Sequence, residues 1–276
     1  MAVLNPARRR VVLLAREDEL DSVLALRRIA AHLGDLGTAD DASPDAALVC
    51  DDTAATRRLL TAGVPVVHLR SGHPGADEPP SPAGALAWTH RPGWLPASAT
   101  AATGRPTGAL APARPAHHRS RAGTLLLLSL WGVPGDEADA FVSGPLPALV
   151  REASRRTGSC TVVSDARLDD ALHATETDVD ALHASCAVLL ASPTLGALAL
   201  AHARRSSVAL LPPLGETQRA LAKSMLEVLP LPSAHDPDAW RPPYGSPWAR
   251  LDPALDDLRG AQRVARTLRQ LAFAPW

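Results

Sequence analysis

Cysteine, aromatic side chains and net charge are all scarce in this sequence of 276 residues. Its 3 cysteines, Cys50, Cys160 and Cys186, do not stand at metal-ligand spacing. Each lies at the edge of an apolar, strand-like run, so we expect buried, reduced thiols. The formal net charge of -1 gives no positive field that would attract a polyanion, so no nucleic-acid partner is expected.

Long apolar runs are missing as well. No apolar span reaches about 18 residues, and no N-terminal run combines a charged region, an apolar core and a small-residue cleavage site. We therefore expect neither membrane insertion nor secretion, and a cytoplasmic location. The HExxH, CxxC and Walker patterns are also absent, so no metal site is expected. Lysine occurs only at Lys223, which makes an arginine here a generic cation and gives arginine clusters little weight.

Buried-strand runs alternate with segments of helical periodicity through most of the chain. In the first half, strands are expected over 11–15, 46–50 and 64–69, and helices over 20–33 and 53–62. In the second half, strands are expected over 124–130, 160–163, 187–191 and 208–211, and helices over 146–157 and 197–205. The alternation predicts an α/β fold with parallel sheets, and the length fits two similar domains.

The two halves are joined by a segment dense in Pro, Gly and Ala over 71–121, in which only 84–90 resembles a strand. We expect loops there, around one or two edge elements. Helical spacing returns over 258–271, after a Pro- and Trp-rich loop over 234–253. The expected division is a first domain over 1–120, a second over 121–235, and a loop and terminal helix over 236–276.

The stretch from Ala187 to Gln218 carries the strongest functional signal. It follows the order strand, tight loop, helix, strand and polar loop. Ser192 suits a helix N-cap and Pro193 the first helical position. A helix that starts at the C-terminal end of a parallel strand favours an anion such as a diphosphate. Ser192, Thr194 and Gly196 are the predicted phosphate contacts.

This stretch resembles the donor half of GT-B glycosyltransferases, which bind a nucleotide-sugar between two Rossmann-like halves. The strand that ends in Pro212-Pro213 and the loop that ends in Gln218 carry the match. The helix departs from the family pattern, since the usual ribose-binding acid would stand near Leu200 and no carboxylate lies anywhere from Ala191 to Pro213. The resemblance implies two Rossmann-like domains with a cleft between them and a C-terminal helix that returns to the N-terminal domain. It also implies that Gln218 contacts the sugar hydroxyls.

A narrower resemblance lies in the block Leu128–Asp136, in Asp180-Ala181-Leu182-His183 and in the run 199–218. These segments are similar to proteins related to cytosylglucuronic acid (CGA) synthase, which occur in actinobacteria. The founding activity joins glucuronic acid from UDP-glucuronate to cytosine during nucleoside antibiotic formation. The resemblance implies a metal-independent glycosyltransferase of secondary metabolism. Its substrates would be a nucleotide-sugar, UDP-linked by expectation, and a small acceptor, with no other cofactor.

The same resemblance places the loop of Ser129, Trp131 and Gly132 at the interdomain cleft. Trp131 would stack on a base or sugar there. A large indole at this place is equally typical of a boundary side chain that packs between domains, and this alternative stays open.

An inverting transfer requires a base for the acceptor and donors that stabilise the leaving diphosphate. Related enzymes place a Gly-rich loop, often with His, after the first strand, whereas this sequence has a run of acids from Glu17 to Asp21. Glu17 and Asp18 are candidate bases, although favourable contact with a helix N-terminus also explains acids there. His68 and His73, at the end of the third expected strand, are the other candidates.

Two functions remain open from the sequence. The intact Pro-Pro and Gln218 element favours an active glycosyltransferase. The missing Gly-rich loop and ribose acid favour a catalytically degenerate relative that acts as a partner subunit or a ligand-binding protein. The second hypothesis predicts a stable complex with another protein or a homodimer.

Overall fold

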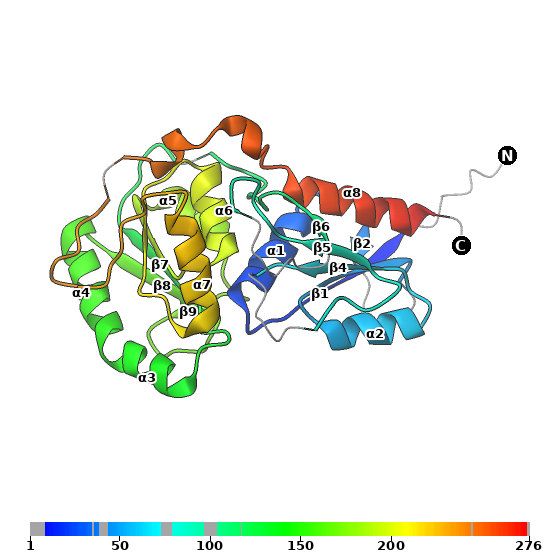
Figure 1. The fold of residues 1–276 in the computed structure, drawn as a ribbon, viewed down its shortest axis with the longest axis horizontal. Helices are drawn as coiled ribbons and strands as arrows, with labels where there is room; N and C mark the ends of the chain where they lie inside the picture. The colour runs from blue at the N-terminus through cyan, green and yellow to red at the C-terminus, as the bar shows by residue number, and fades with distance from the viewer. Residues whose placement is uncertain are drawn as a thin grey trace.

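The computed structural model describes residues 9–34, 36–38, 44–72, 79–96, 104–116, 118–243 and 245–274. Its strands form two fully parallel sheets, one in each half of the chain (Figure 1). The first sheet has the order β2 (Gly37–Thr38), β1 (Arg10–Ala15), β3 (Ala46–Cys50), β4 (Val66–Arg70), β5 (Leu86–Thr89), β6 (Arg105–Pro106). The second has the order β11 (Val208–Leu210), β10 (Val188–Ala191), β7 (Thr124–Leu128), β8 (Cys160–Ser164), β9 (Leu172–His173). The expected pair of Rossmann-like domains is confirmed.

Helices cover both faces of each sheet, as parallel sheets require. In the first domain, α1 (Leu20–Ala30) and α8 (Gly260–Phe273) pack on one face and α2 (Thr53–Thr61) on the other. In the second domain, one face carries α5 (Val179–Ser185), α6 (Leu195–Ala203) and α7 (Gly215–Leu226), and the other α3 (Gly135–Ser143) and α4 (Pro145–Thr157). Two short 3-10 helices, Pro247–Arg250 and Pro253–Leu255, precede α8.

Helix α8 crosses back to the first domain, where Figure 1 shows it lying along the sheet in red. Its buried side chains Val264, Ala265 and Leu268 recur at helical spacing and join the core of the first domain. The expected return of the terminal helix is therefore confirmed.

The first sheet ends at Pro106 and the second begins at Thr124. The division at residues 120 and 235 remains a proposal.

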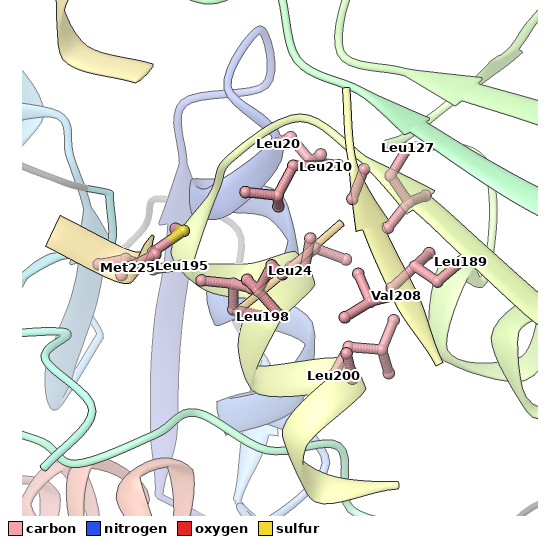
Figure 2. Packing of buried hydrophobic residues seen from close by; sticks show 14 of the residues in the cluster. Leu20, Leu24, Leu127, Leu189, Leu195, Leu198, Leu200, Val208, Leu210 and Met225 are labelled. Carbon is pink, nitrogen blue, oxygen red and sulfur yellow. The ribbon is translucent and has the colours of Figure 1, made fainter. Parts of the chain in front are cut away.

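The two domains share an apolar core. Leu20 and Leu24 of α1 belong to the same buried cluster as Leu195 and Leu198 of α6 (Figure 2). Burial of each such leucine contributes roughly 1.5–3 kcal/mol. The first turns of α1 thus pack into the second domain, which fixes the two domains against each other.

Three local expectations were wrong. Helix α6 starts at Leu195, and its N-cap is Thr194, whose side chain accepts from the amide of Ala197; Ser192 and Pro193 precede it. Gln218 lies in the first turn of α7 and not in a loop. Cys50 is buried as expected, but Cys160 and Cys186 are only partly buried.

Within the described ranges, no helix has the length and apolarity needed to cross a bilayer.

Candidate ligand site between the two domains

Each sheet has a switch point at which the chain leaves neighbouring strands in opposite directions. In the second sheet it lies between β7 and β10, and in the first between β1 and β3. Open parallel sheets bind ligands outside the carboxyl ends of the strands at such points. Arg16 follows β1 and Asp51 follows β3, while Ser129 follows β7 and Ser192 follows β10. These residues therefore mark where a ligand is expected.

A cavity of about 220 Å³ lies between the two switch points. The first domain lines it with Arg16, Glu19, Asp21, Asp51 and Gly72. The second domain contributes five of the residues predicted for donor binding, namely Ser129, Trp131, Gly132, Thr194 and Gln218. Pro193, Leu214, Thr217 and Leu221 complete the wall. The structure thus brings these five residues together, and their contact with a donor stays a prediction.

Ser192 and Gln218 hold the loops of the second domain in place. The hydroxyl of Ser192 accepts from the amide of Ser129 at 3.0 Å. The side-chain amide of Gln218 donates to the carbonyl of Ser129 at 2.9 Å, and its oxygen accepts from the amide of Leu214 at 3.0 Å. Both side chains are buried. They fix the loop after β7 against α6 and α7, and so shape the wall of the cavity.

Trp131 meets Arg16 across the cavity. The guanidinium carbon of Arg16 lies 4.5 Å from the centroid of the indole, in cation–π geometry. Arg16 also forms an ion pair with Glu19 at 3.2 Å and donates to the carbonyl of Asp51. Trp131 is nevertheless 41% exposed. One edge of the site is therefore a contact between the domains that leaves much of the indole open to solvent.

The carboxylate of Asp21 occupies the start of α6. Its oxygens accept from the amides of Leu195 at 3.0 Å and Gly196 at 2.7 Å. These amides belong to the first turn of α6, where backbone donors lack partners within the helix. Gly196, a predicted phosphate contact, lies buried beneath Asp21. Burial raises the pKa of Asp21 to about 7, against the opposing effect of the two amide donors.

Asp51 holds a strained position at the end of β3. Its φ of 61° lies in the left-handed region, which costs a non-glycine residue of order 1 kcal/mol or more. The carboxylate accepts from the amide of Ser71 at 2.9 Å and from its hydroxyl. Asp51 is only 4% exposed, yet it lines the cavity. These contacts hold the carboxylate of Asp51 in place at the end of β3.

Three of the predicted catalytic residues, Glu17, Asp18 and His68, do not line this cavity. Glu17 and Asp18 are exposed on the turn between β1 and α1 and do not line it. His68 is buried in β4, where its Nδ1 lies 2.8 Å from the hydroxyl of Ser81 and burial lowers its pKa to about 4. His73 lies outside the described residues. Their catalytic roles remain predictions.

Sequence reasoning missed three carboxylates that do line the cavity, Glu19, Asp21 and Asp51. The available signal was the place of Asp51, directly after a buried strand of a parallel sheet. Asp21 carried no such signal, because its partners lie 174 and 175 residues away.

Among the described residues, no group of His, Cys, Asp and Glu side chains is placed to hold a metal ion.

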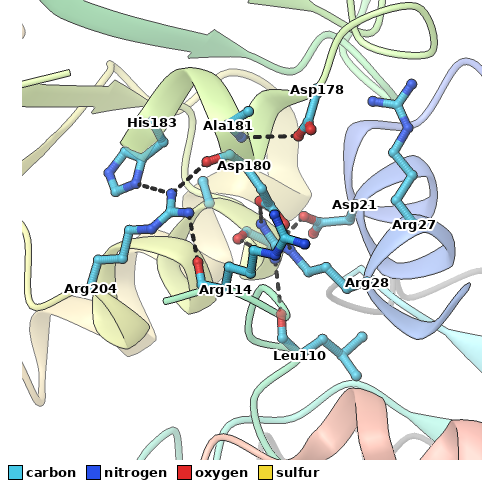
Figure 3. Close-up of polar contacts among 12 residues, drawn as sticks. Asp21, Arg27, Arg28, Leu110, Arg114, Asp178, Asp180, Ala181, His183 and Arg204 are labelled. Atoms are coloured by element: carbon cyan, nitrogen blue, oxygen red, sulfur yellow. Dashed lines mark hydrogen bonds and ion pairs between the residues drawn. The ribbon is translucent and has the colours of Figure 1, made fainter. Parts of the chain in front are cut away.

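Further polar contacts join α1 to the second domain (Figure 3). Arg28 forms an ion pair with Asp180 at 2.7 Å and donates to the carbonyls of Leu110 at 3.0 Å and Gly196 at 2.9 Å. Arg204 donates to the carbonyl of Asp180 at 2.7 Å, and its guanidinium lies 2.9 Å from Nδ1 of His183. The domain interface is therefore polar and ordered on this side and apolar around Leu20 and Leu24.

Two Rossmann-like domains, a cavity between their switch points and a terminal helix that returns to the first domain define a GT-B fold. The chain belongs to the CGA synthase-related protein family, whose model matches residues 11–276.

Solved structures of glycosyltransferases are similar over nearly the whole chain. Spinosyn rhamnosyltransferase SpnG complexed with spinosyn aglycone has a TM-score of 0.48 and 16% identity, covering 95% of this chain and 96% of that chain. MurG of Acinetobacter baumannii has a TM-score of 0.49 and 8% identity, covering 95% and 99%. A UDP-glucosyltransferase from Polygonum tinctorium has a TM-score of 0.44 and 10% identity, covering 97% and 94%. No match was found among curated protein sequences.

Proposed function

We propose that this chain is a glycosyltransferase that moves a sugar from a nucleotide-sugar to a small acceptor. The observation that carries the proposal is the convergence of Ser129, Trp131, Gly132, Thr194 and Gln218 on one cavity between the two switch points. These residues come from three separate segments of the second domain, and the donor is expected on that side.

The chemistry divides between the domains. The amides at the start of α6 supply donors for a leaving diphosphate, and the exposed face of Trp131 offers a stacking surface. The first domain supplies the carboxylates Glu19, Asp21 and Asp51 to the cavity, and we assign the base that takes the acceptor proton to this set. Asp21 stands out, because a pKa of about 7 matches a base that works near neutral pH.

Thermal unfolding against a panel of UDP, dTDP, GDP, CDP and their sugars tests this function. A ligand that binds only the folded state stabilises it, by about 2.7 kcal/mol at a hundred times its Kd. We expect one nucleotide to raise the melting temperature and its sugar conjugate to be hydrolysed or transferred. No shift and no turnover across the panel would reject the proposal.

Two variants of Thr194 locate the binding. Thr194→Asp keeps a good N-cap but places a carboxylate beside the diphosphate, so it should abolish the nucleotide-induced shift. Thr194→Ser keeps both the cap and the neutral side chain and serves as the control. Equal shifts in both variants would remove this loop from the donor site.

A second function has its own supporting observation, the carboxylate of Asp21 on the amides of α6. If that arrangement is permanent, the chain is a degenerate glycosyltransferase that acts as a partner subunit or ligand-binding protein. This function predicts no response to any nucleotide and a stable complex, either with itself or with another protein. Sedimentation of the pure chain measures the first kind of complex, and a strictly monomeric chain that turns over a sugar donor would contradict this function.

A further inference from the structure

Each domain places a buried carboxylate on the first turn of a helix of the other domain. Asp21, from α1, accepts from the amides of Leu195 and Gly196 in α6. Asp165, from the loop after β8, accepts from the amide of Leu20 in α1 at 3.2 Å. The two carboxylates are 6% and 3% exposed. Two contacts of the same kind therefore cross the domain boundary in opposite directions, each between an aspartate side chain and the backbone amides of a helix start.

The two halves of this pair differ in their surroundings. Asp165 also accepts from the hydroxyl of Ser129 at 2.7 Å and the amide of Leu130 at 2.8 Å, so its own domain holds it as well. Asp21 lines the cavity, whereas Asp165 does not. Both oxygens of Asp21 have their described hydrogen bonds with the other domain. Asp21 is thus the half that a molecule entering the cavity reaches first.

The fit of α1 against α6 is close at this point. A Cβ atom on Gly196 would stand 2.6 Å from Oδ1 of Asp21 and 3.0 Å from Cδ1 of Leu24. The guanidinium of Arg28 also donates to the backbone carbonyl of Gly196. The first turn of α6 is therefore covered by α1, and its amides are not open to a ligand while Asp21 stays.

Size and charge both argue that a donor and this arrangement exclude each other. Pockets for drug-sized ligands span about 300–1,000 Å³, and the cavity holds about 220 Å³. A diphosphate would also lie beside Asp21, Asp51 and Glu19, with only Arg16 as a cationic side chain among the lining residues. Close contact between like charges is unfavourable inside a protein, where the dielectric constant is low.

We propose that the carboxyl group of Asp21 closes the donor site and is exchanged for a phosphate group of the incoming donor. The Asp165 contact persists through the exchange and keeps α1 attached to the second domain. Asp21, released from α6, then faces the widened cavity. This inference rests on the proposed function, because it assigns the regulation of the same donor site.

Calorimetric titration with inorganic pyrophosphate and with UDP, dTDP, GDP and CDP tests the exchange. Asp21→Ala removes the competing carboxyl group, so it should bind pyrophosphate and the matching nucleotide about tenfold or more tightly than the wild type, as expected for the loss of a competitor that holds two amide donors. Asp21→Asn keeps the shape of the side chain and serves as a second variant in case Asp21→Ala misfolds. It should also bind pyrophosphate and the nucleotide more tightly than the wild type.

Asp178→Ala is the matched control. Asp178 is likewise an N-terminal cap, accepting from the amide of Ala181 in α5, but it lies outside the donor cavity. Its loss should leave pyrophosphate affinity unchanged. A gain of affinity in Asp178→Ala as large as that in Asp21→Ala would mean a general charge effect and would overturn the exchange.

The outcomes separate the two proposals. Nucleotide binding by the wild type with no gain in either Asp21 variant overturns the exchange and leaves the glycosyltransferase in place. Pyrophosphate binding only after removal of Asp21, with none by the wild type and no nucleotide bound by any variant, means that Asp21 is not displaced. That result overturns the exchange and rejects the nucleotide-dependent function. Absence of all binding in every variant rejects both.

Discussion

Arg28 and Asp180 form an ion pair at 2.7 Å across the domain boundary, with the Arg28 side chain 1% and the Asp180 side chain 24% exposed. Removal of one partner from a buried pair typically costs about 3–5 kcal/mol, because the other charge is left without compensation. Arg28 also donates to two carbonyls, so Arg28→Ala should lower the free energy of unfolding by about that amount. Urea unfolding measures the loss.

Arg167 offers a matched control for Arg28. It pairs with Glu176 at 3.0 Å, but the two side chains are 75% and 64% exposed. Exposed pairs of this kind contribute about 0–1 kcal/mol. Arg167→Ala should therefore be nearly neutral, and similar losses in both variants would show that burial between the domains does not set the cost.

The pH dependence of stability should report on Asp21. Burial raises its pKa in the folded state from 3.8 to about 7, so the folded chain holds a proton that the unfolded chain has released over this interval. Stability from this group is therefore full below about pH 4 and is lost as the pH rises toward 7. The facing charges are Asp51, which acts in the same direction, and Arg28, which opposes it.

The comparison with Asp21→Asn isolates this group from the other titrations. The difference in free energy of unfolding, wild type minus variant, should fall between pH 4 and 7 by up to about 1.4 kcal/mol per pH unit. Urea midpoints at several pH values give the slope. A rising difference would mean that the two amide donors outweigh burial and hold the carboxylate ionised.

Gly196 should not tolerate a side chain. A Cβ atom there meets Asp21 and Leu24 at 2.6 and 3.0 Å, so Gly196→Ala must push α1 away from α6. We expect a loss of about 1–3 kcal/mol, typical of overpacking. Gly135→Ala, in the first turn of α3 with no atom within 4 Å, should instead stabilise by up to about 1 kcal/mol. Stabilisation by both substitutions would contradict the close fit.

Trp131 separates a structural contact from a donor contact. Its exposed stacking on Arg16 is worth about 0.5–1 kcal/mol, so Trp131→Ala should change unfolding only slightly. If the indole stacks on the nucleotide, the same variant should lose at least about tenfold in nucleotide affinity, while Trp131→Phe keeps most of it. Calorimetry on both variants gives the comparison, and a stability loss without a loss of affinity would assign Trp131 to the domain interface.

The sequence predicted the sheets well where local signals agree. The strand over 46–50 matches β3 in full, because Pro44 and Asp45 precede a wholly apolar run and Asp51 and Asp52 follow it. The start of α6 was misplaced, because Ser192-Pro193 imitates a cap while Thr194 supplies it. A cap depends on the φ and ψ angles of single residues, and a sequence pattern fixes those only loosely.

The wall that the second domain contributes to the cavity was predictable, and the wall from the first domain was not. Ser129, Trp131 and Thr194 follow strands of one domain, so their grouping follows from its topology. The place of Asp21 depends on how one domain docks on the other. No periodicity within α1 shows that its first turn faces α6, since a buried acid and an exposed one occupy the same kind of position in the pattern.

Helix α8 has a consequence for how this chain is made. Val264, Ala265, Leu268 and Ala272 complete the core of a domain whose strands span residues 10–106. During synthesis that apolar face stays uncovered until residues 260–272 have left the ribosome, after every strand and helix of the second domain, the last of which ends at Leu226. The first domain should therefore reach its native state last, and a chain that stops before α8 should expose this surface to aggregation and to chaperones.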